Sequence, residues 1–323
     1  MSKPVVVVTR RWPEAVEARL GELFDAHLNA GDVPLDPDGL REALGAADAV
    51  FCTVTDRLDA AVLGAEPMRA KLIGNFGVGF NNIDVDAARA RGLVVTNTPD
   101  VLTDATADLA MALLLMTARR CGEGERWLRA GGWRGWYPTM MMGTHVTGKT
   151  VGIVGFGRIG QAMARRAFHG FGMKVLFHGS VAPGAEELMA QGVERCESLD
   201  ELLARSDFVS LHCPGGARNR HLINAERLAH MKPTAFLINT ARGDVVDEAA
   251  LVDALRAGRI AGAGLDVYEA EPTVSPELLT MDNVVLLPHL GSGTEETRTA
   301  MGLKVVENAV AFFDGREPPN RVV

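Results

Sequence analysis

The sequence predicts an α/β protein built from two doubly wound parallel sheets. Short apolar segments alternate with amphipathic helical segments along almost the whole chain, a pattern typical of parallel strands joined by helical crossovers. The length of 323 residues exceeds what one ordinary core needs and suits two domains. The apolar strands fall into two groups, one on each side of a long apolar helical segment.

The first group of strands belongs to the smaller unit. We expect strands at 5–9, 49–54, 72–75 and 93–96, and helices at 13–28 and 84–91. Pro99 closes this unit, and Thr103 or Asp104 can cap a helix that runs to about Gly131. Residues 133–143 follow neither a helical nor a strand period, so we expect an irregular arm that exposes apolar side chains.

The second group of strands begins after Lys149 and forms the larger unit. We expect its strands at 150–154, 174–177, 208–211, 235–239, 263–267 and 284–287. A final helix from Glu295 to about Phe313 begins with two acidic residues, which suit the positive end of a helix. Because the second sheet is complete without it, this helix should return to the first unit. The predicted domains are residues 1–103 with 292–323, and residues 104–291.

Bulk properties narrow the class of protein. Hydrophobic residues make up 47% and charged residues 23% of the chain, as in globular proteins, and the net charge of −8 argues against a large nucleic-acid surface. The longest apolar stretch, 109–116, is too short to span a membrane, and the valines at 5–8 indicate a strand rather than a signal peptide. Four cysteines without paired spacing predict free thiols and no metal site: Cys52, Cys121, Cys196 and Cys213. We expect a cytoplasmic protein.

A glycine motif opens the larger unit. Gly155, Gly157 and Gly160 form G-x-G-x-x-G directly after an apolar strand and at the start of a helix. The first glycine permits a tight turn, the second lets the backbone approach a pyrophosphate, and the third lets helix and strand pack closely. The helix N-terminus then faces the phosphates. The motif predicts a Rossmann dinucleotide-binding domain.

Three polar residues follow three strands of the larger unit. Arg242, Glu271 and His289 each stand shortly after a strand, and parallel strands end at one edge of the sheet. Each alone has a structural explanation, but together beside a dinucleotide loop they predict a catalytic set. Reduction of a 2-keto acid needs a proton donor near neutral pH, which histidine provides. A neighbouring carboxylate orients the ring, and an arginine fork binds a substrate carboxylate.

At these residues the chain resembles the D-isomer-specific 2-hydroxyacid dehydrogenase family over essentially its whole length. The motifs are G-F-G-R-I-G, S-D-F-V-S-L-H-C-P, N-T-A-R-G-D-V-V-D, G-L-D-V-Y-E-A-E-P and L-P-H-L-G-S. The resemblance implies that Arg242, Glu271 and His289 are catalytic. It also implies a discontinuous substrate-binding domain, made from both ends of the chain, around an inserted NAD(P)-binding domain.

The resemblance also implies binding residues. For the substrate, besides Arg242 and His289, they are Val78 and Gly79 through their amides, and Thr53 and Val54, which face the substrate side chain. For the cofactor they are the glycine loop with Thr106, Arg158, Ile159, Gly179, Ser180, Cys213, Pro214, Thr240, Ala241, Arg242, Asp266, His289, Gly291 and Ser292. Within the family, residues 98–110 and the arm W-x-x-W-x-P most resemble glyoxylate/hydroxypyruvate reductases. The stretch G-G-A-R-N-R at 215–220 departs from the family's P-L-T-x-x-T.

The second strand of the larger unit bears on the choice of cofactor. NAD-selective enzymes usually end this strand with an acidic residue that holds the ribose hydroxyls, and here Gly179 stands at that position. The arginine of NADP-selective relatives is replaced by Ser180. Arg158 could approach the ribose phosphate, although it could equally span the pyrophosphate of NAD. We expect an NAD(P) enzyme that leans towards NADP.

The sequence leaves two alternative functions open, and it also bears on the oligomeric state. The chain could be a D-2-hydroxyacid dehydrogenase for a different keto acid, or a non-catalytic cofactor-sensing binding protein on the same fold. We expect a homodimer built around the helix from Asp104 and the arm at 133–143, because Trp133 and Trp136 are costly to expose. By resemblance, the arm reaches the partner's site near Met140. The alternative is an arm folded on its own domain.

Overall fold

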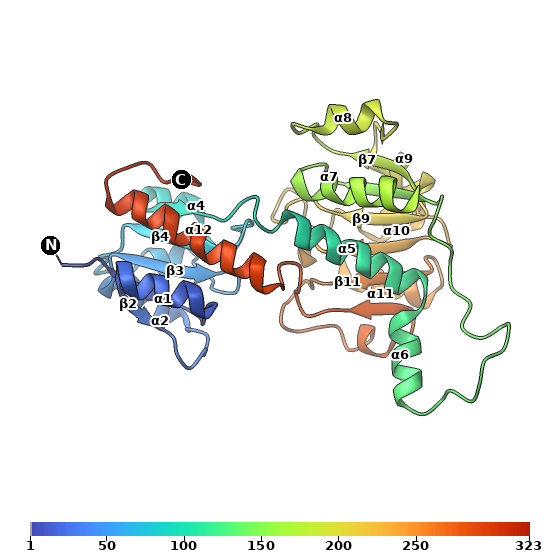
Figure 1. The fold of residues 1–323 in the computed structure, drawn as a ribbon, viewed down its shortest axis with the longest axis horizontal. Helices are drawn as coiled ribbons and strands as arrows, with labels where there is room; N and C mark the ends of the chain where they lie inside the picture. Colours follow the sequence, from blue (N-terminus) through green and yellow to red (C-terminus); the bar gives the residue numbers. More distant parts are fainter. Residues whose placement is uncertain (1) are drawn as a thin grey trace. The chain divides into compact units, whose positions relative to one another are not determined.

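The computed structural model describes residues 2–323, which divide into two compact units (Figure 1). Unit 1 comprises the residues up to Leu102 together with Gly293–Val323, and unit 2 comprises Thr103–Ser292. Each unit holds one entirely parallel sheet with helices on both faces, which confirms the predicted fold class. Among the residues that the structure describes, no helix has both the length and the apolar character needed to cross a bilayer.

Unit 1 is a five-stranded sheet in the order β2-β1-β3-β4-β5. Its strands are β1 (Val5–Val8), β2 (Asp25–Leu28), β3 (Ala49–Thr53), β4 (Leu72–Phe76) and β5 (Val94–Thr96). Its helices are α1 (Glu14–Leu23), α2 (Pro37–Ala46), α3 (Ala60–Leu63), α4 (Val85–Ala90) and α12 (Glu295–Phe313). Helices α1 and α12 bury one apolar face of the sheet, and α2, α3 and α4 bury the other.

The elements predicted for unit 1 need correction. The helix expected at 13–28 ends at Leu23, because Phe24 turns extended and buries its ring, and β2 then pairs with β1 from Asp25 onwards. Helix α2 was not predicted, although its start carries clear signals. Asp36 accepts a hydrogen bond from the amide of Gly39, and Pro37 occupies the first helical position.

Unit 2 is a seven-stranded sheet in the order β12-β11-β10-β9-β6-β7-β8. Its strands are β6 (Thr150–Val154), β7 (Lys174–His178), β8 (Glu194–Arg195), β9 (Phe208–Leu211), β10 (Phe236–Asn239), β11 (Gly262–Leu265) and β12 (Val284–Leu286). Its longer helices are α5 (Thr103–Ala118), α6 (Cys121–Arg129), α7 (Arg158–Arg165), α8 (Ala185–Ala190), α9 (Leu199–Arg205), α10 (Ala225–His230) and α11 (Glu248–Arg256). The remaining helical turns are η1 (Arg166–Gly170), η2 (Gly243–Val245) and η3 (Leu278–Thr280).

The layers and the strand order of unit 2 indicate which edge of its sheet binds a ligand. Helices α5 and α7 bury one face of the sheet, and α9, α10 and α11 bury the other. Since all seven strands are parallel, their carboxyl ends share one edge, and the strand order reverses between β6 and β9. Open α/β sheets bind ligands at this reversal point.

The single long helix predicted from Asp104 to Gly131 is wrong. Helix α5 ends at Ala118, Arg120 adopts a left-handed conformation with φ of 56°, and α6 starts at Cys121. The helix is interrupted where the chain comes back after the arm. There the amide of Thr144 donates to the carbonyl of Ala118, the last residue of α5, at 2.7 Å. Residues 133–143 contain no helix or strand, as the sequence predicts.

Candidate active site

The glycine loop joins β6 to α7 at the carboxyl edge of unit 2. Gly155 has φ of 91°, and a Cβ added there would lie 2.6 Å from the amide nitrogen of Cys213. A Cβ at Gly160 would overlap the carbonyl of Gly155, whereas one at Gly157 would meet no atom within 4 Å. The first and third glycines therefore serve close packing, and the second leaves the backbone open to a ligand.

The end of β7 lies beside this loop. The amide of Gly155 donates to the carbonyl of His178, and a Cβ at Gly179 would lie 3.4 Å from the Cα of Gly155. Gly179 has φ of 136°, a conformation that side chains strain to adopt. Buried Gln161 donates to the carbonyls of Phe156 and Pro183, both at 3.2 Å, and so ties the segment after β7 to the start of α7.

Three neighbouring strands, β10, β11 and β12, bring the expected catalytic residues together. Arg242 follows β10, and its guanidinium donates to the carbonyl of Ala241 at 2.7 Å. Glu271 lies in the loop after β11, and His289 follows β12. The Nδ1 atom of His289 lies 2.8 Å from Oε2 of Glu271, and the two side chains are 33% and 30% exposed. The pair is thus half-buried and still accessible to a small substrate.

The loops that carry Arg242 and Glu271 touch at Gly243. A Cβ added to Gly243 would overlap the backbone carbonyl of Tyr268, which begins the loop after β11. The hydroxyl of Tyr268 in turn donates to the carbonyl of Leu287, at the end of β12, at 2.8 Å. The three loops are therefore packed against one another, the first two through their backbones and the second and third through the Tyr268 side chain.

Asp266 fixes the backbone around His289. His289 has φ of 55°, which is uncommon for a residue with a side chain, and its amide donates to the carbonyl of Asp266 at 2.9 Å. The carboxylate of Asp266 accepts the amides of Leu290 at 2.6 Å and Gly291 at 2.8 Å. Burial raises the pKa of Asp266, although these two amides oppose the shift. The carboxylate thereby holds the strained turn that presents the imidazole.

The charges of the site offset one another. Burial alone would raise the pKa of Glu271, but the hydrogen bond and charge of His289 hold it below the ordinary value of 4.5. Burial lowers the pKa of Arg242, while Glu271 and Asp244 oppose that effect. Because the pKa of Glu271 is depressed in the folded state, its contribution to stability is present above the ordinary carboxyl pKa and is lost as the pH falls through the lowered value.

The residues expected to bind substrate in unit 1 lie together at the carboxyl edge of its sheet. Thr53 ends β3 and Val54 follows it, while Val78 and Gly79 follow the adjacent strand β4. A Cβ at Gly77 would lie 2.6 Å from the side chain of Val54, so the two loops are in contact.

Sequence reasoning missed the side chains that hold these two loops. Buried Asp56 accepts the amide of Thr53 at 2.7 Å and the hydroxyl of Thr9 at 2.5 Å. The amide group of Asn82 donates to the carbonyl of Thr53, and that of Asn75 donates to the carbonyl of Gly79. The asparagines of N-F-G-V-G-F-N-N were the available signal, because asparagine commonly satisfies loop carbonyls.

The remaining cofactor candidates line the same edge of unit 2. Cys213 and Pro214 follow β9, Thr240 and Ala241 follow β10, and the hydroxyl of Thr106 donates to the carbonyl of Gly291 at 3.2 Å. Arg158 and Ile159 begin α7, Ser180 follows Gly179, and Ser292 follows Gly291.

These residues fit a dinucleotide. The hydroxyl oxygen of Thr240 is buried and has no hydrogen-bond partner within residues 2–323, so it has a polar group to offer to a ligand. No side chain caps α7, whose N-cap is Gly157, and the positive end of this helix suits a pyrophosphate. Among the described residues no cluster of His, Cys, Asp or Glu could hold a metal ion.

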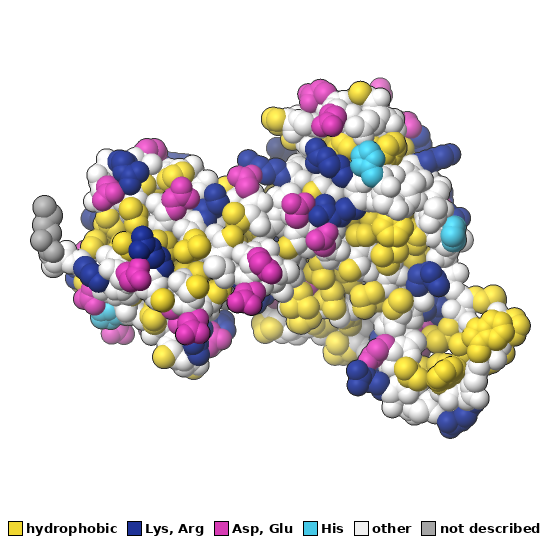
Figure 2. Space-filling view, in the orientation of Figure 1, with side chains coloured by type: hydrophobic (Ala, Val, Ile, Leu, Met, Phe, Trp, Pro, Cys, Tyr) yellow, Lys and Arg dark blue, Asp and Glu magenta, His cyan; other side chains and the backbone are white. Residues whose placement is uncertain are grey.

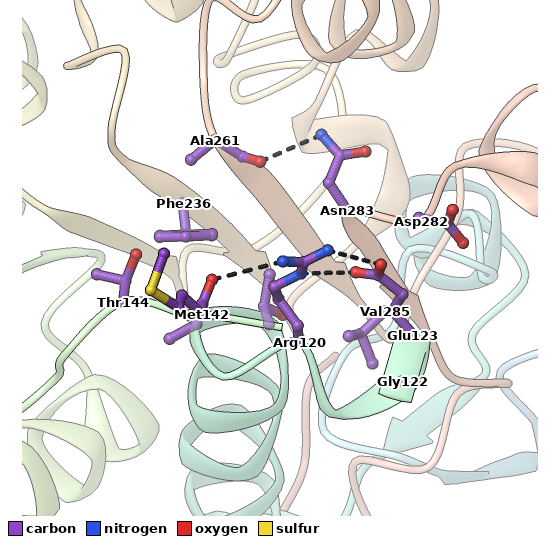
Figure 3. A pocket seen from close by; sticks show the side chains of 13 residues that line it. Arg120, Gly122, Glu123, Met142, Thr144, Phe236, Ala261, Asp282, Asn283 and Val285 are labelled. Carbon is purple, nitrogen blue, oxygen red and sulfur yellow. Dashed lines mark hydrogen bonds and ion pairs between the residues drawn. The ribbon is translucent and has the colours of Figure 1, made fainter. Parts of the chain in front are cut away.

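A separate pocket of about 430 Å³ lies at the opposite edge of unit 2, where β10, β11 and β12 begin (Figure 3). Phe236, which begins β10, lines it together with Met142 of the arm, and the side chain of Asn283 donates to the carbonyl of Ala261 at 3.1 Å. Arg120 points across it and is held by Glu123 through two hydrogen bonds of 2.7 Å. The pocket contains none of the expected site residues, and its cation is already paired.

A Rossmann unit with this glycine loop, and with Arg242, Glu271 and His289 on loops at the same sheet edge, is typical of a nicotinamide-dependent dehydrogenase. Residues 111–291 match the family described as "D-isomer specific 2-hydroxyacid dehydrogenase, NAD binding domain". The chain therefore belongs to the D-isomer specific 2-hydroxyacid dehydrogenase family. It is an NAD(P)-dependent oxidoreductase that acts on CH–OH groups.

Relatives and solved structures agree with this assignment. The glyoxylate reductase of Thermococcus onnurineus is 48% identical over 326 aligned positions, which cover 99% of this chain and 96% of the relative. A D-isomer specific 2-hydroxyacid dehydrogenase from Polaromonas superposes with a TM-score of 0.91 at 37% identity, covering 99% and 100% of the two chains. An NADPH-dependent glyoxylate/hydroxypyruvate reductase from Sinorhizobium meliloti, solved with NADP and malonate, gives 0.87 at 38% identity, covering 100% and 97%.

Proposed function

We propose that this protein reduces the small 2-keto acids glyoxylate and hydroxypyruvate to glycolate and D-glycerate, with His289 as the proton donor. The observation that carries the proposal is the 2.8 Å contact between His289 and Glu271 at the sheet edge that also holds the glycine loop. The 48% identity to a glyoxylate reductase supports the choice of substrates.

The residues divide the chemistry among themselves. The nicotinamide cofactor supplies the hydride that the carbonyl carbon receives. His289 delivers the proton to the carbonyl oxygen through Nε2, because its Nδ1 is held by the acceptor Glu271. Arg242 binds the substrate carboxylate and polarises the carbonyl. The amides of Val78 and Gly79 bind the same carboxylate, and Thr53 and Val54 limit the size of the substrate side chain.

NADPH is the preferred cofactor in this proposal, with NADH also used. Gly179 provides no carboxylate that would repel a 2′-phosphate, and Ser180 adds a hydroxyl donor next to it. Arg158 is the cationic residue within the glycine motif G-F-G-R-I-G, and it begins α7. The NADPH-dependent relative from S. meliloti supports the same choice.

The test measures kcat/KM for four keto acids, glyoxylate, hydroxypyruvate, pyruvate and phenylpyruvate, each with NADH and with NADPH. We expect the first two substrates to give the highest values and NADPH to exceed NADH. A highest value with phenylpyruvate would overturn the substrate proposal. A preference for NADH of about tenfold, equivalent to about 1.4 kcal/mol, would overturn the cofactor proposal.

A variant pair separates charge from shape in the same measurement. Gly179 is a poor position for an added acid, because its φ of 136° strains any side chain. Exposed Ser180 avoids this difficulty. Ser180→Asp should lower kcat/KM with NADPH and leave that with NADH nearly unchanged, whereas the neutral control Ser180→Asn should keep the preference for NADPH.

We propose further that the protein is a symmetric homodimer. Trp133 and Trp136 are 52% and 77% exposed, and Tyr137 and Met142 are also exposed, so the arm presents an apolar surface (Figure 2). Monomeric proteins rarely leave such clusters in water. We propose that the contact surface of each subunit consists of its arm, residues 133–143, and its helix α5.

Sedimentation velocity at micromolar concentration is expected to show a dimer. Replacing Trp133 and Trp136 together by serine should shift the population towards monomer, because large aromatic side chains contribute most to such interfaces. Replacing exposed Leu279, which lies outside the arm, by serine is the matched control and should leave the dimer intact. A wild-type protein that sediments only as a monomer would contradict the proposal.

A further inference from the structure

The loop that carries Glu271 is bound on both flanks by one carboxylate. Oε2 of Glu248 accepts the amide of Glu269 at 3.2 Å, and Oε1 accepts the amide of Ser275 at 3.0 Å. In the sequence, Glu271 lies between the two residues that donate these amides. Across residues 2–323, Glu248 is the one side chain whose described hydrogen bonds reach both flanks of this loop.

Glu248 itself is firmly placed. It is the first residue of α11, whose N-cap Asp247 accepts the amide of Ala250 at 3.0 Å. The same helix buries Leu251 and Leu255 in the core of unit 2. The loop is thus attached to a helix of the core through Glu248, and its inner flank is held in addition by the side chain of Glu269, which pairs with Arg220 at 2.9 Å and His221 at 2.7 Å.

The outer flank of the loop depends on Glu248 more than the inner flank does. The turn at its tip is closed internally, since the amide of Thr273 donates to the carbonyl of Ala270 at 2.8 Å. Glu271 bonds inward, with Oε1 accepting the amide of Tyr268 at 3.1 Å and Oε2 facing His289. On the outer flank, the side chain of Ser275 bonds to exposed Glu277. A shift of the outer flank would therefore move Glu271 relative to the imidazole.

We propose that Glu248 is a positioning residue for proton transfer. By holding both flanks of the loop that carries Glu271, it sets the distance between Glu271 and His289. It touches neither substrate nor cofactor in this scheme. The proposal rests on the proposed catalytic roles of His289 and Glu271 and adds the residue that keeps them in register.

The test uses Glu248→Gln in the full-length protein. An amide nitrogen cannot accept a hydrogen bond, so one of the two loop amides would face a donor instead of an acceptor. We expect kcat with glyoxylate and NADPH to fall roughly 10- to 100-fold, because small misplacements of reacting groups have effects of this size. The pH profile of kcat/KM should shift, while the Kd of NADPH stays close to that of the wild type.

Two further variants distinguish positioning from a general structural role. Glu277→Gln removes a neighbouring carboxylate that accepts from the Ser275 hydroxyl and from neither loop amide that Glu248 binds, and it should leave kcat and the pH profile unchanged. In a Glu271→Gln background, Glu248→Gln should have almost no further effect on kcat, because both act through one contact. Equal losses in the two backgrounds, or a fall in Tm with an unchanged pH profile, would overturn the proposal.

Other outcomes identify which proposal has failed. If Glu248→Gln does not fold, Glu248→Asp keeps the charge but is too short to bridge both amides, and the same loss and pH shift are expected. If His289→Ala is inactive and neither Glu248 variant changes kcat, the positioning role alone is wrong. If His289→Ala is fully active, the proposed function is wrong.

Discussion

Replacing His289 by alanine is expected to lower kcat by roughly 100- to 10,000-fold, the range typical of a lost general acid. Binding of NADPH, measured by fluorescence titration, should change little, because the glycine loop lies elsewhere along the sheet edge. Turnover should fall because, among the described residues, His289 is the histidine whose ring contacts Glu271 and could give a proton to the carbonyl oxygen.

The backbone at this position calls for a matched variant. His289 has φ of 55°, and asparagine adopts this region more readily than alanine does. His289→Asn should therefore keep the turn held by Asp266 and still lose turnover. His27→Ala, at an exposed site in unit 1, serves as the unaffected control. Wild-type kcat across pH in both His289 variants would show that the proton comes from another group.

Arg242→Gln is expected to lower kcat/KM for glyoxylate by roughly 10- to 150-fold, which corresponds to the loss of about 1.5–3 kcal/mol for a hydrogen bond to a charged group. Both parameters should change, with a higher KM from weaker carboxylate binding and a lower kcat from a less polarised carbonyl. Burial lowers the pKa of Arg242, but an arginine remains charged at neutral pH, so the whole effect is assigned to the lost cation.

Geometry can be separated from charge at the same position. Arg242→Lys retains the cation but not the planar fork, so it should recover only part of the activity. Arg256→Gln, on the exposed face of α11, should behave as the wild type. If Arg242→Gln raised KM without changing kcat, the arginine would bind substrate but take no part in polarising the carbonyl.

The elements that carry strong local signals could be predicted from the sequence. The helix Glu295–Phe313 and the strand Thr150–Val154 have the predicted bounds, because caps, acidic first turns and apolar runs mark them. Strand β2 was missed because its residues, D-A-H-L, are largely exposed at a sheet edge and show no apolar alternation. The break after Ala118 accompanies a hydrogen bond from the amide of Thr144 to the carbonyl of Ala118, and local sequence does not reveal this partner.

The candidate site shows the same division. Arg242, Glu271 and His289 could be proposed because each follows a predicted strand, and strand ends in a parallel sheet share one edge. The supporting roles could not be proposed: Asp266 was expected to contact the cofactor and Glu248 was not singled out, whereas both accept backbone amides, and every residue except proline carries a backbone amide. Only the folded structure brings those partners within reach.

The contact at Gly243 limits how the substrate range of this enzyme can be redesigned. Any side chain there would overlap the carbonyl of Tyr268, so the loops after β10 and β11 can change only as a pair. A library that varies the loop after β11 while retaining Glu271 would need to keep Gly243 fixed, and a grafted loop would need a matching partner after β10. Thr53 and Val54, which are proposed to limit substrate size, belong to unit 1, so they can be varied without altering the sequence of the paired loops after β10 and β11.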